Sequence, residues 1–404
     1  MYFFYKKKLK NENMAKVNLN LLKLKKNYLF NDIEKKVEEK QKNQNLEILN
    51  LGIGDVTLPI ADSVIEASKL SLDELKSPKT LKGYGPADGY QFLKKSIKEN
   101  DYKDIDIDLG EIFVSIGSKY TLGNIGDLFS ADNCVGLCDP TYPVYEDSNI
   151  MCGRKNKLFY IPLLEENNFK PRILKKHLDI VYLCSPNNPT GTALTKAELQ
   201  QWVEYAQKTK SLIIFDAAYE AFISSDEVPH SIYEIPGADE VAIEMKSFSK
   251  TAGFTSLRCS YVVIPKKLKT KENISINELW QRYINTKIGG IPYPIQKAAE
   301  AIYSPKGQLE VKAIIDEYMK NTLILKEGLN QIGLTTYGGD NCPFIWCKTL
   351  KNLTSWEFFD LLLEKNIVTI PGSGFGKCGE GFVRFSGFAA KETIDKALTC
   401  IKKL

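Results

Sequence analysis

The sequence has little histidine and little arginine. Its 404 residues include two histidines, His177 and His230, which lie far apart in the chain. A histidine triad or a multi-histidine metal site is therefore not expected, and we predict no metal. Only five arginines occur among the 54 basic residues. Because a guanidinium grips anions with two parallel donors, an arginine in so lysine-rich a chain is a candidate anion ligand unless it is there by chance.

Long apolar runs and paired cysteines are also missing. No apolar run reaches the roughly 18 residues that a membrane-spanning helix needs. The opening, MYFFYKKKLKNEN, puts aromatic residues before lysines and has no apolar stretch typical of a signal peptide. The nine cysteines form no CxxC pair, and several lie in apolar, strand-like runs. We therefore expect no membrane association, and reduced core thiols in a cytoplasm.

The net charge of the chain is too small to indicate a protein that binds nucleic acid. The net charge of +4 comes from 54 basic and 50 acidic residues, without a dominant basic block after the first 26 positions. Residues 1–26 are predicted to be a basic, partly disordered arm. Met14 is an alternative start, so the sequence leaves open whether residues 1–13 belong to the mature protein. Apolar positions at helical spacing predict a helix over Leu29–Lys40.

Short apolar runs alternate with helical stretches between about residues 60 and 300. This pattern predicts an α/β fold with a mostly parallel sheet covered by helices on both faces. In such sheets, ligands bind beyond the carboxyl ends of the strands. The runs are EIFVS at 111–115, CVGLC at 134–138, IVYLC at 180–184, LIIFD at 212–216, VAIEM at 241–245 and YVVIP at 261–265.

The last hundred residues have a different pattern: one long helix, shorter strands (FIWCK and VRFS) and a final helix. We therefore predict a smaller α+β domain at 305–404, a large ligand-binding domain at 59–304, and an N-terminal segment at 27–58 that packs with the small domain.

Polar motifs follow several of the predicted strands directly. Ser247-Phe248-Ser249-Lys250 comes after one strand and is followed by Arg258. A desolvated lysine can form a Schiff base, and serines with an arginine can hold a phosphate beside it. SFSK taken alone is more often a solvated loop lysine, so the other motifs decide its meaning.

Two further motifs support a cofactor site. Asp216 ends the apolar strand LIIF, where a carboxylate could pair with a protonated pyridine nitrogen, and Tyr219 lies three residues later. Taken alone, Asp216 could equally be a turn or helix-cap residue. The string SPNNPTGT at 185–192 presents Asn188 in a proline-rigidified turn, whose alternative is a purely structural role.

In this order and spacing, SPNNPTGT, DAAY and SFSK resemble the fold-type I pyridoxal 5′-phosphate (PLP) aminotransferases. Within that superfamily the chain is most similar to the LL-diaminopimelate aminotransferases, through NLGIGD at 50–55, GYGP at 83–86, DPTYPVY at 139–145 and SFSKTAGFTSLR at 247–258. The resemblance runs from about Asn27 to Lys391. It implies a seven-stranded, mostly parallel sheet in the large domain, a cytoplasmic enzyme of lysine biosynthesis, and a homodimer with shared active sites.

The resemblance also implies a role for each matched residue. Lys250 is expected to form the Schiff base with PLP and to shuttle the proton in catalysis. Other residues are expected to bind the cofactor: Asp216 at the pyridine nitrogen, Asn188 and Tyr219 at the ring hydroxyl, Tyr142 on the ring, and Ser118, Lys119, Ser247, Ser249 and Arg258 at the phosphate, with Tyr84 from the partner subunit. The expected substrate residues are Tyr28, Gly54, Lys119, Asn188 and Arg384, with Arg384 as the fork for the α-carboxylate.

The match departs from the family at the far end of the substrate. The family usually has an acidic residue where Ala87 stands and an asparagine in the segment that here contains Ile288-Gly289. Asp88 could replace the missing acidic group. We therefore predict an LL-diaminopimelate:2-oxoglutarate aminotransferase, with a related aminotransferase using another donor as the alternative. A lyase or decarboxylase would use the same cofactor set, whereas a DNA-binding regulator would need a longer N-terminal extension than 26 residues.

Overall fold

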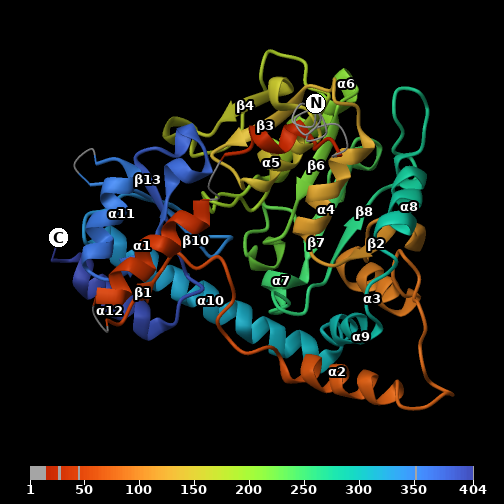
Figure 1. Cartoon of the computed structure of the whole chain (residues 1–404), viewed down its shortest axis with the longest axis horizontal. Coiled ribbons are helices and arrows are strands. Elements are labelled where there is room, and N and C mark those ends of the chain that lie inside the picture. The colour runs from red at the N-terminus through yellow and green to blue at the C-terminus, as the bar shows by residue number, and fades with distance from the viewer. Residues whose placement is uncertain (1–14, 26–28, 44–45, 351–352, 404) are drawn as a thin grey trace, which may run out of the picture.

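The computed structural model describes residues 15–25, 29–43, 46–350 and 353–403 of the chain. A seven-stranded sheet forms its centre (Figure 1) in the order β2-β8-β7-β6-β5-β3-β4. Strands β7, β6, β5, β3 and β4 run parallel, whereas β8 runs antiparallel to both of its neighbours. The strands are β2 (Ile112–Ser115), β3 (Val135–Asp139), β4 (Leu158–Pro162), β5 (Ile180–Cys184), β6 (Leu212–Asp216), β7 (Ala242–Ser247) and β8 (Ser260–Val263).

The apolar strands of this sheet are covered on both faces. Because successive side chains of a strand point to opposite faces, Ile213 and Phe215 of β6 join one core cluster while Leu212 and Ile214 join the other. Helices α3 (Gln91–Asp101), α6 (Lys196–Thr209) and α9 (Tyr293–Ala301) contribute to the first cluster, and α4 (Ser118–Ile125), α5 (Val144–Met151) and α8 (Ile276–Lys287) to the second. The predicted α/β architecture is confirmed, and β4 is the strand that the sequence pattern missed.

A second, antiparallel sheet lies at the other end of the molecule, in the order β12-β13-β10-β9. Its strands are β9 (Thr336–Gly338), β10 (Phe344–Lys348), β12 (Ile370–Pro371) and β13 (Phe382–Ser386). Buried leucines and isoleucines of α10 (Pro305–Gln331), α11 (Ser355–Glu364) and α12 (Lys391–Ile401) pack against β10 and β13. Figure 1 shows α10 running from this sheet to α2 (Asp62–Glu74), so one helix of about 40 Å connects the two regions.

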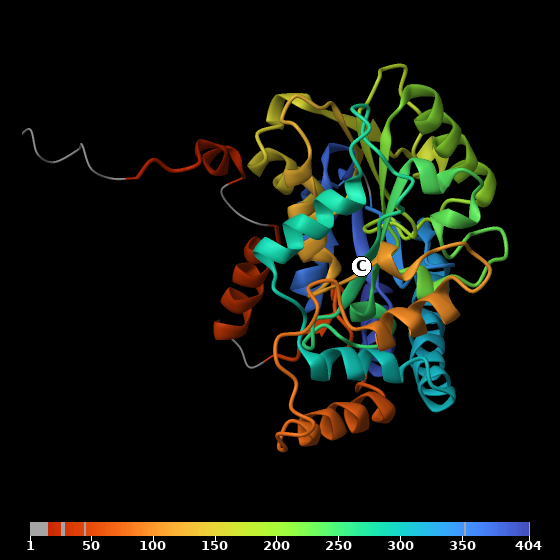
Figure 2. The same cartoon turned by 90° about the vertical axis from the view of Figure 1, so that its right-hand side faces the viewer.

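The N-terminal segment reaches the second region. Strand β1 (Leu49–Asn50) pairs with β11 (Ile367–Val368), and α1 (Leu29–Asn43) lies beside it, where Lys36 pairs with Asp360. Residues 19–23 form a short 3-10 helix beside α5 at the edge of the molecule (Figure 2). The expectations for residues 1–14 and for Tyr28 lie outside the described residues, and the domain boundaries stay a prediction.

All nine cysteines are free, but the expectation that they are core thiols holds for five of them only. Cys138, Cys184, Cys259, Cys342 and Cys347 are buried, whereas the other four are half-buried. None of the described helices is long and apolar enough to cross a membrane.

The core of the second region yields a stability prediction. Leu325 and Leu323 both lie on α10, but Leu325 is fully buried and Leu323 is 53% exposed. We expect Leu325→Ala to lower the free energy of unfolding by about 2–5 kcal/mol, because it leaves a cavity against β10 and β13. Leu323→Ala should change it by less than about 0.5 kcal/mol. Urea denaturation followed by circular dichroism measures both, and equal shifts of the midpoint would contradict the packing described here.

Candidate active site

Polar side chains converge on the edge of the large sheet where its parallel strands end. Asp216 is the last residue of β6, Asn188 follows β5, and Ser247 ends β7. Arg258 reaches the same edge because β8 is antiparallel, so the start of β8 lies beside the end of β7, with Ser260 opposite Ser247. The fold therefore gathers residues that are up to 70 positions apart in sequence at one place.

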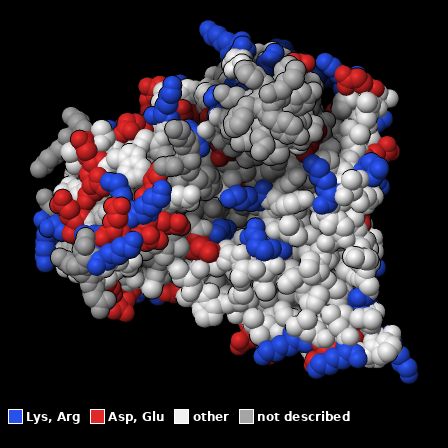
Figure 3. Space-filling view, in the orientation of Figure 1, with Lys and Arg blue, Asp and Glu red and all other residues white. Residues whose placement is uncertain are grey.

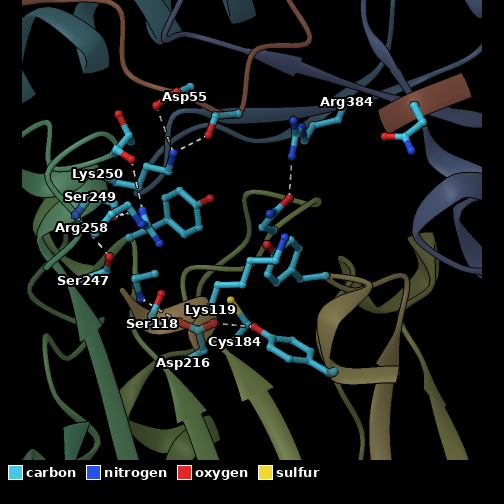
Figure 4. Close-up of a pocket in the computed structure, with 18 of the residues that line it drawn as sticks. Asp55, Ser118, Lys119, Cys184, Asp216, Ser247, Ser249, Lys250, Arg258 and Arg384 are labelled. Carbon is cyan, nitrogen blue, oxygen red and sulfur yellow. Dashed lines mark hydrogen bonds and ion pairs between the residues drawn. The ribbon is translucent and has the colours of Figure 1, made fainter. Parts of the chain in front are cut away.

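These side chains line a cavity of about 550 Å³, a size typical of small-molecule sites. Figure 3 shows it as a hollow that contains lysine and arginine side chains, and Figure 4 shows the residues around it. Twelve residues predicted from the sequence line this one cavity: Gly54, Ser118, Lys119, Tyr142, Asn188, Asp216, Tyr219, Ser247, Ser249, Lys250, Arg258 and Arg384. Tyr84 does not line it, and Tyr28 is outside the described residues.

Lys250 is the nucleophile candidate of the cavity. It lies on α7 (Phe248–Thr251), and its amine donates to the Gly54 carbonyl and lies 3.7 Å from Asp55 Oδ1. Burial lowers the pKa of Lys250 to about 8, and the positive charges of Arg384 and Arg258 act in the same direction. A large fraction of this amine is thus neutral and nucleophilic at mildly alkaline pH.

Asp216 is a buried carboxylate whose partners are neutral donors. Tyr145 donates its hydroxyl to Oδ2 at 2.7 Å, and the Ala218 amide donates to Oδ1 at 3.1 Å. Burial raises the pKa of Asp216, and these two hydrogen bonds oppose that rise only in part. A cationic ligand group beside Asp216 would restore its charged form.

Arg384 is the opposite case, a buried guanidinium with no carboxylate partner among the described residues. Its Nη1 donates to Asn188 Oδ1 at 2.7 Å, its Nη2 donates to the Gly52 carbonyl at 2.9 Å, and its Nε is buried without a partner. The rings of Phe344 and Phe375 lie 4.2 and 5.2 Å from its Cζ. Burial lowers the pKa of Arg384 to about 10, so a ligand carboxylate would stabilise its charge.

A third group of residues forms an anion cradle. Ser118 begins helix α4, whose N-terminus favours negative charge. Arg258 Nη1 donates to Ser249 Oγ at 3.3 Å, and Ser247 Oγ caps α7 by accepting from the Ser249 amide. The cavity therefore offers a cradle for a phosphate, a carboxylate for a cationic ring nitrogen, and an amine.

A buried ion pair stabilises two of the segments that carry these groups. Lys246, directly before Ser247, is 3% exposed and lies 3.8 Å from Glu220, directly after Tyr219. Burial lowers the pKa of Lys246, but the carboxylates of Glu220, Glu244 and Asp101 outweigh it and raise the pKa overall. The pair fixes the end of β7 against the turn after β6.

Comparison with known proteins identifies the family. Residues 47–401 match the family described as aminotransferase class I and II. The chain belongs to this family. It is 50% identical to an LL-diaminopimelate aminotransferase of Azobacteroides pseudotrichonymphae, over 97% of this chain and 99% of that protein, and 50% identical to one of Bacteroides fragilis, over 96% and 99%. Among solved structures, an L,L-diaminopimelate aminotransferase from Chlamydomonas reinhardtii matches with 38% identity and a TM-score of 0.92, covering 97% of this chain and 99% of that one.

Family membership makes the chain a PLP-dependent aminotransferase of fold type I, as the sequence predicted. The cavity fits this cofactor, because PLP has a phosphate at one end, a ring nitrogen that can be protonated at the other, and an aldehyde that an amine can attack. Two features of the cavity match the cofactor most directly: the buried Asp216, whose hydrogen-bond partners are neutral, and the phosphate cradle.

Sequence reasoning missed six polar residues of the aminotransferase cavity: Tyr145, Cys184, Asp55, Glu34, Asn31 and Thr255. Tyr145 had a usable signal, because it lies three residues after Tyr142 in DPTYPVY, and the two rings lie 5.9 Å apart in the structure. Cys184 ends β5 and lies opposite Asp216 in the sheet. Glu34 and Asp55 come from the N-terminal segment, whose place beside the cavity no local pattern indicates.

The expectation that Asp88 replaces an acidic group at position 87 does not fit the structure. Asp88 Oδ2 lies 2.5 Å from the Nζ of Lys94, whose side chain is 1% exposed. If Asp88 turned to a substrate, the buried ammonium of Lys94 would lose its ion-pair partner. Asp88 is therefore expected to stay paired with Lys94. Ala87 packs against the apolar core cluster that Tyr142 and Ile288 also contact.

Gly117 gives a prediction for the phosphate cradle. Its φ of +115° disfavours other residues, and a Cβ at this position would lie 2.2 Å from Arg258 Nη2. We expect Gly117→Ala to weaken PLP binding at least tenfold, since displacing the guanidinium removes a charge-assisted contact of about 1.5–3 kcal/mol. Absorbance titration of the apoenzyme with PLP measures this affinity.

Gly123→Ala is the matched control, because Gly123 lies on the same helix α4 and a Cβ there meets nothing within 4 Å. Unchanged PLP affinity in Gly117→Ala would show that Arg258 does not depend on the space that Gly117 leaves.

Proposed function

We propose that this aminotransferase transfers the amino group of glutamate to tetrahydrodipicolinate, whose ring opens with uptake of one water, forming LL-diaminopimelate and 2-oxoglutarate in lysine biosynthesis. The observation that carries the proposal is the 50% identity, over nearly the full length, to proteins named LL-diaminopimelate aminotransferase. The cavity supports it, because it combines the cofactor set with a buried guanidinium for an amino-acid carboxylate.

We assign the cofactor contacts as follows. Asp216 would hold the protonated ring nitrogen, and its buried position makes that pair strong. Asn188 turns its carbonyl oxygen to Arg384, so its NH2 group is available to the ring hydroxyl, together with Tyr219. Tyr142 would stack on the ring. The phosphate would be bound by Ser118, Lys119, Ser247, Ser249 and Arg258, all of which line the cavity.

PLP, when bound, supplies an electron sink that stabilises negative charge at the α-carbon of the amino acid. The chain's own contribution is to bind and to move protons. Lys250 would hold the cofactor between turnovers. During turnover it would take the proton from the substrate α-carbon and deliver it to the cofactor carbon that is bonded to the transferred nitrogen. The lowered pKa of its amine, about 8, suits both roles. Arg384 would fix the α-carboxylate of the substrate. This contact would orient the bond between the α-carbon and its hydrogen, which is the bond that the reaction breaks.

A single-turnover titration tests the reaction. With LL-diaminopimelate or glutamate added separately, we expect the absorbance band of the bound cofactor to shift to that of its amino form. Aspartate and aromatic amino acids should leave it unchanged. Lys250→Ala should slow this conversion on the order of a thousandfold or more, because the proton carrier is lost.

Lys320→Ala serves as the control. It removes a lysine whose side chain is 64% exposed and does not line the cavity. If another amino acid converts the cofactor while diaminopimelate does not, the reaction class stands and the proposed substrate is wrong.

We also propose a cytoplasmic homodimer with shared active sites. Tyr84 is fully exposed in the single chain and does not line its own cavity, as expected if it reaches the phosphate of the partner subunit. Exposed leucines at positions 70, 72 and 81 precede it on α2 and the following loop, and Figure 2 shows α2 at the outer edge of the molecule. Figure 3 shows few charged side chains over α9, a composition that favours association. The nine free cysteines support a reducing compartment.

Subunit complementation tests the shared site. Tyr84→Ala and Lys250→Ala, each nearly inactive alone, should regain about a quarter of the wild-type activity when co-expressed, because half of the random dimers then contain one intact site out of two. Specific activity of the co-purified mixture measures this. Recovery would be absent if Tyr84 acted within its own chain.

A related aminotransferase with another donor is the second candidate. It is favoured by Ala87, which offers no charge, and by the Ile288-Gly289 segment, which lacks the family's asparagine. The pairing of Asp88 with Lys94 adds to this argument. The donor titration above distinguishes the two.

A further inference from the structure

One carboxylate of the cavity has no role in holding the cofactor. Glu34 lies on α1 and lines the cavity together with Asn31. The two residues are three positions apart in a helix and therefore share one face, which is turned toward the cavity. Figure 1 shows α1 on the side of the second sheet and α4, which carries Lys119, on the opposite side. The cavity thus has an acidic group on one wall and a lysine on the other.

Glu34 has no cationic partner in the part of the chain that the structure describes. Lys35 is adjacent to Glu34 in sequence, and adjacent side chains on a helix do not face each other. The next lysines on α1 have other partners. Lys36 pairs with Asp360 at 2.7 Å, and Lys40 donates to the Leu363 carbonyl. The residues three and four positions after Glu34 are Val37 and Glu38.

The other charges of the cavity are matched once cofactor and a simple amino acid are bound. Asp216 would face the ring nitrogen, Arg258 the phosphate and Arg384 the α-carboxylate, while Asp55 lies beside Lys250. Lys119 is assigned to the phosphate together with Arg258, so Glu34 is the charged group left to contact the rest of the substrate. Because Glu34 is negative, this part of the cavity fits a cationic group.

We infer that Glu34 binds the distal ammonium of a diamino dicarboxylate substrate. This inference rests on the proposed function and names the residue that confers its specificity. It also explains how diaminopimelate could be recognised although position 87 is alanine and Asp88 is held by Lys94. The acidic group would come from α1 of the same chain instead of from the loop around residue 87.

The experiment compares two substrates in two proteins. LL-diaminopimelate and 2-aminopimelate differ only in the distal amino group, so their ratio of kcat/KM isolates the contact with that group. In the wild-type holoenzyme we expect diaminopimelate to be preferred about tenfold or more, the usual size for a charge-assisted hydrogen bond. Glu34→Gln, which keeps the shape and removes the charge, should bring the ratio close to one, mainly through KM for diaminopimelate.

Glu39→Gln is the matched control. It removes the same charge from the same helix at an exposed position that does not line the cavity. Its ratio should equal that of the wild type.

The outcomes separate the inference from the function on which it rests. If the wild type uses diaminopimelate and Glu34→Gln keeps the preference, the inference is wrong and the proposed function stands. The inference is also overturned if Glu39→Gln lowers the ratio as much as Glu34→Gln, because the effect is then one of net charge on α1. If the wild type converts glutamate but never diaminopimelate, the proposed function fails and the inference fails with it.

Discussion

The burial of charged groups without protein counter-charges is the constraint on which the rest of this structure depends. Asp216 and Arg384 are both buried, yet among the described residues Asp216 has only neutral donors, and Arg384 has only an amide oxygen, a carbonyl and two aromatic rings. Burying a charge in this way is costly unless something compensates it. In an aminotransferase the cofactor and the amino-acid substrate provide that compensation, so the same groups that destabilise the empty cavity bind its ligands tightly.

The fold maintains these charges by bringing two separately built regions to one cavity. Asp216 and Asn188 come from strand ends of the large sheet, whereas Arg384 comes from the middle of β13 in the second sheet. The hydrogen bond from Arg384 to Asn188 joins residues 196 positions apart. Helix α10 packs in the second region and extends to α2, which keeps the two sheets in a fixed relation. Catalytic geometry therefore depends on packing far from the cavity.

Charge matching also gives a physical basis for substrate choice. The reacting end of any amino acid needs only Lys250 and Arg384, so these residues do not distinguish one donor from another. Discrimination must come from groups that contact the remainder of the side chain. In this chain the acidic group at that end lies on α1, in the N-terminal segment, and relatives with an acidic residue at the position of Ala87 would reach the same charge balance by another route.

Sequence alone determined the elements and the identities of most cavity residues. Continuous apolar runs predicted six strands of the large sheet, because strands buried on both faces need apolar side chains throughout. The run LFYIP of β4 was missed because it is an edge strand with a half-exposed Tyr160, so its pattern resembles that of a loop. SPNNPTGT, SFSK and Asp216 were informative because each follows a strand directly, and parallel strands bring their carboxyl ends together.

Only the tertiary structure decided which charges meet. The antiparallel direction of β8 brings Arg258 to the cradle, the pairing of Asp88 with Lys94 removes that carboxylate from the substrate, and the placement of α1 brings Glu34 to the cavity. Strand direction and helix docking are set by the burial of apolar surface over the whole chain, and this long-range effect leaves no local signal. The sequence determined the chemistry of the site, and the fold determined how its charges are paired.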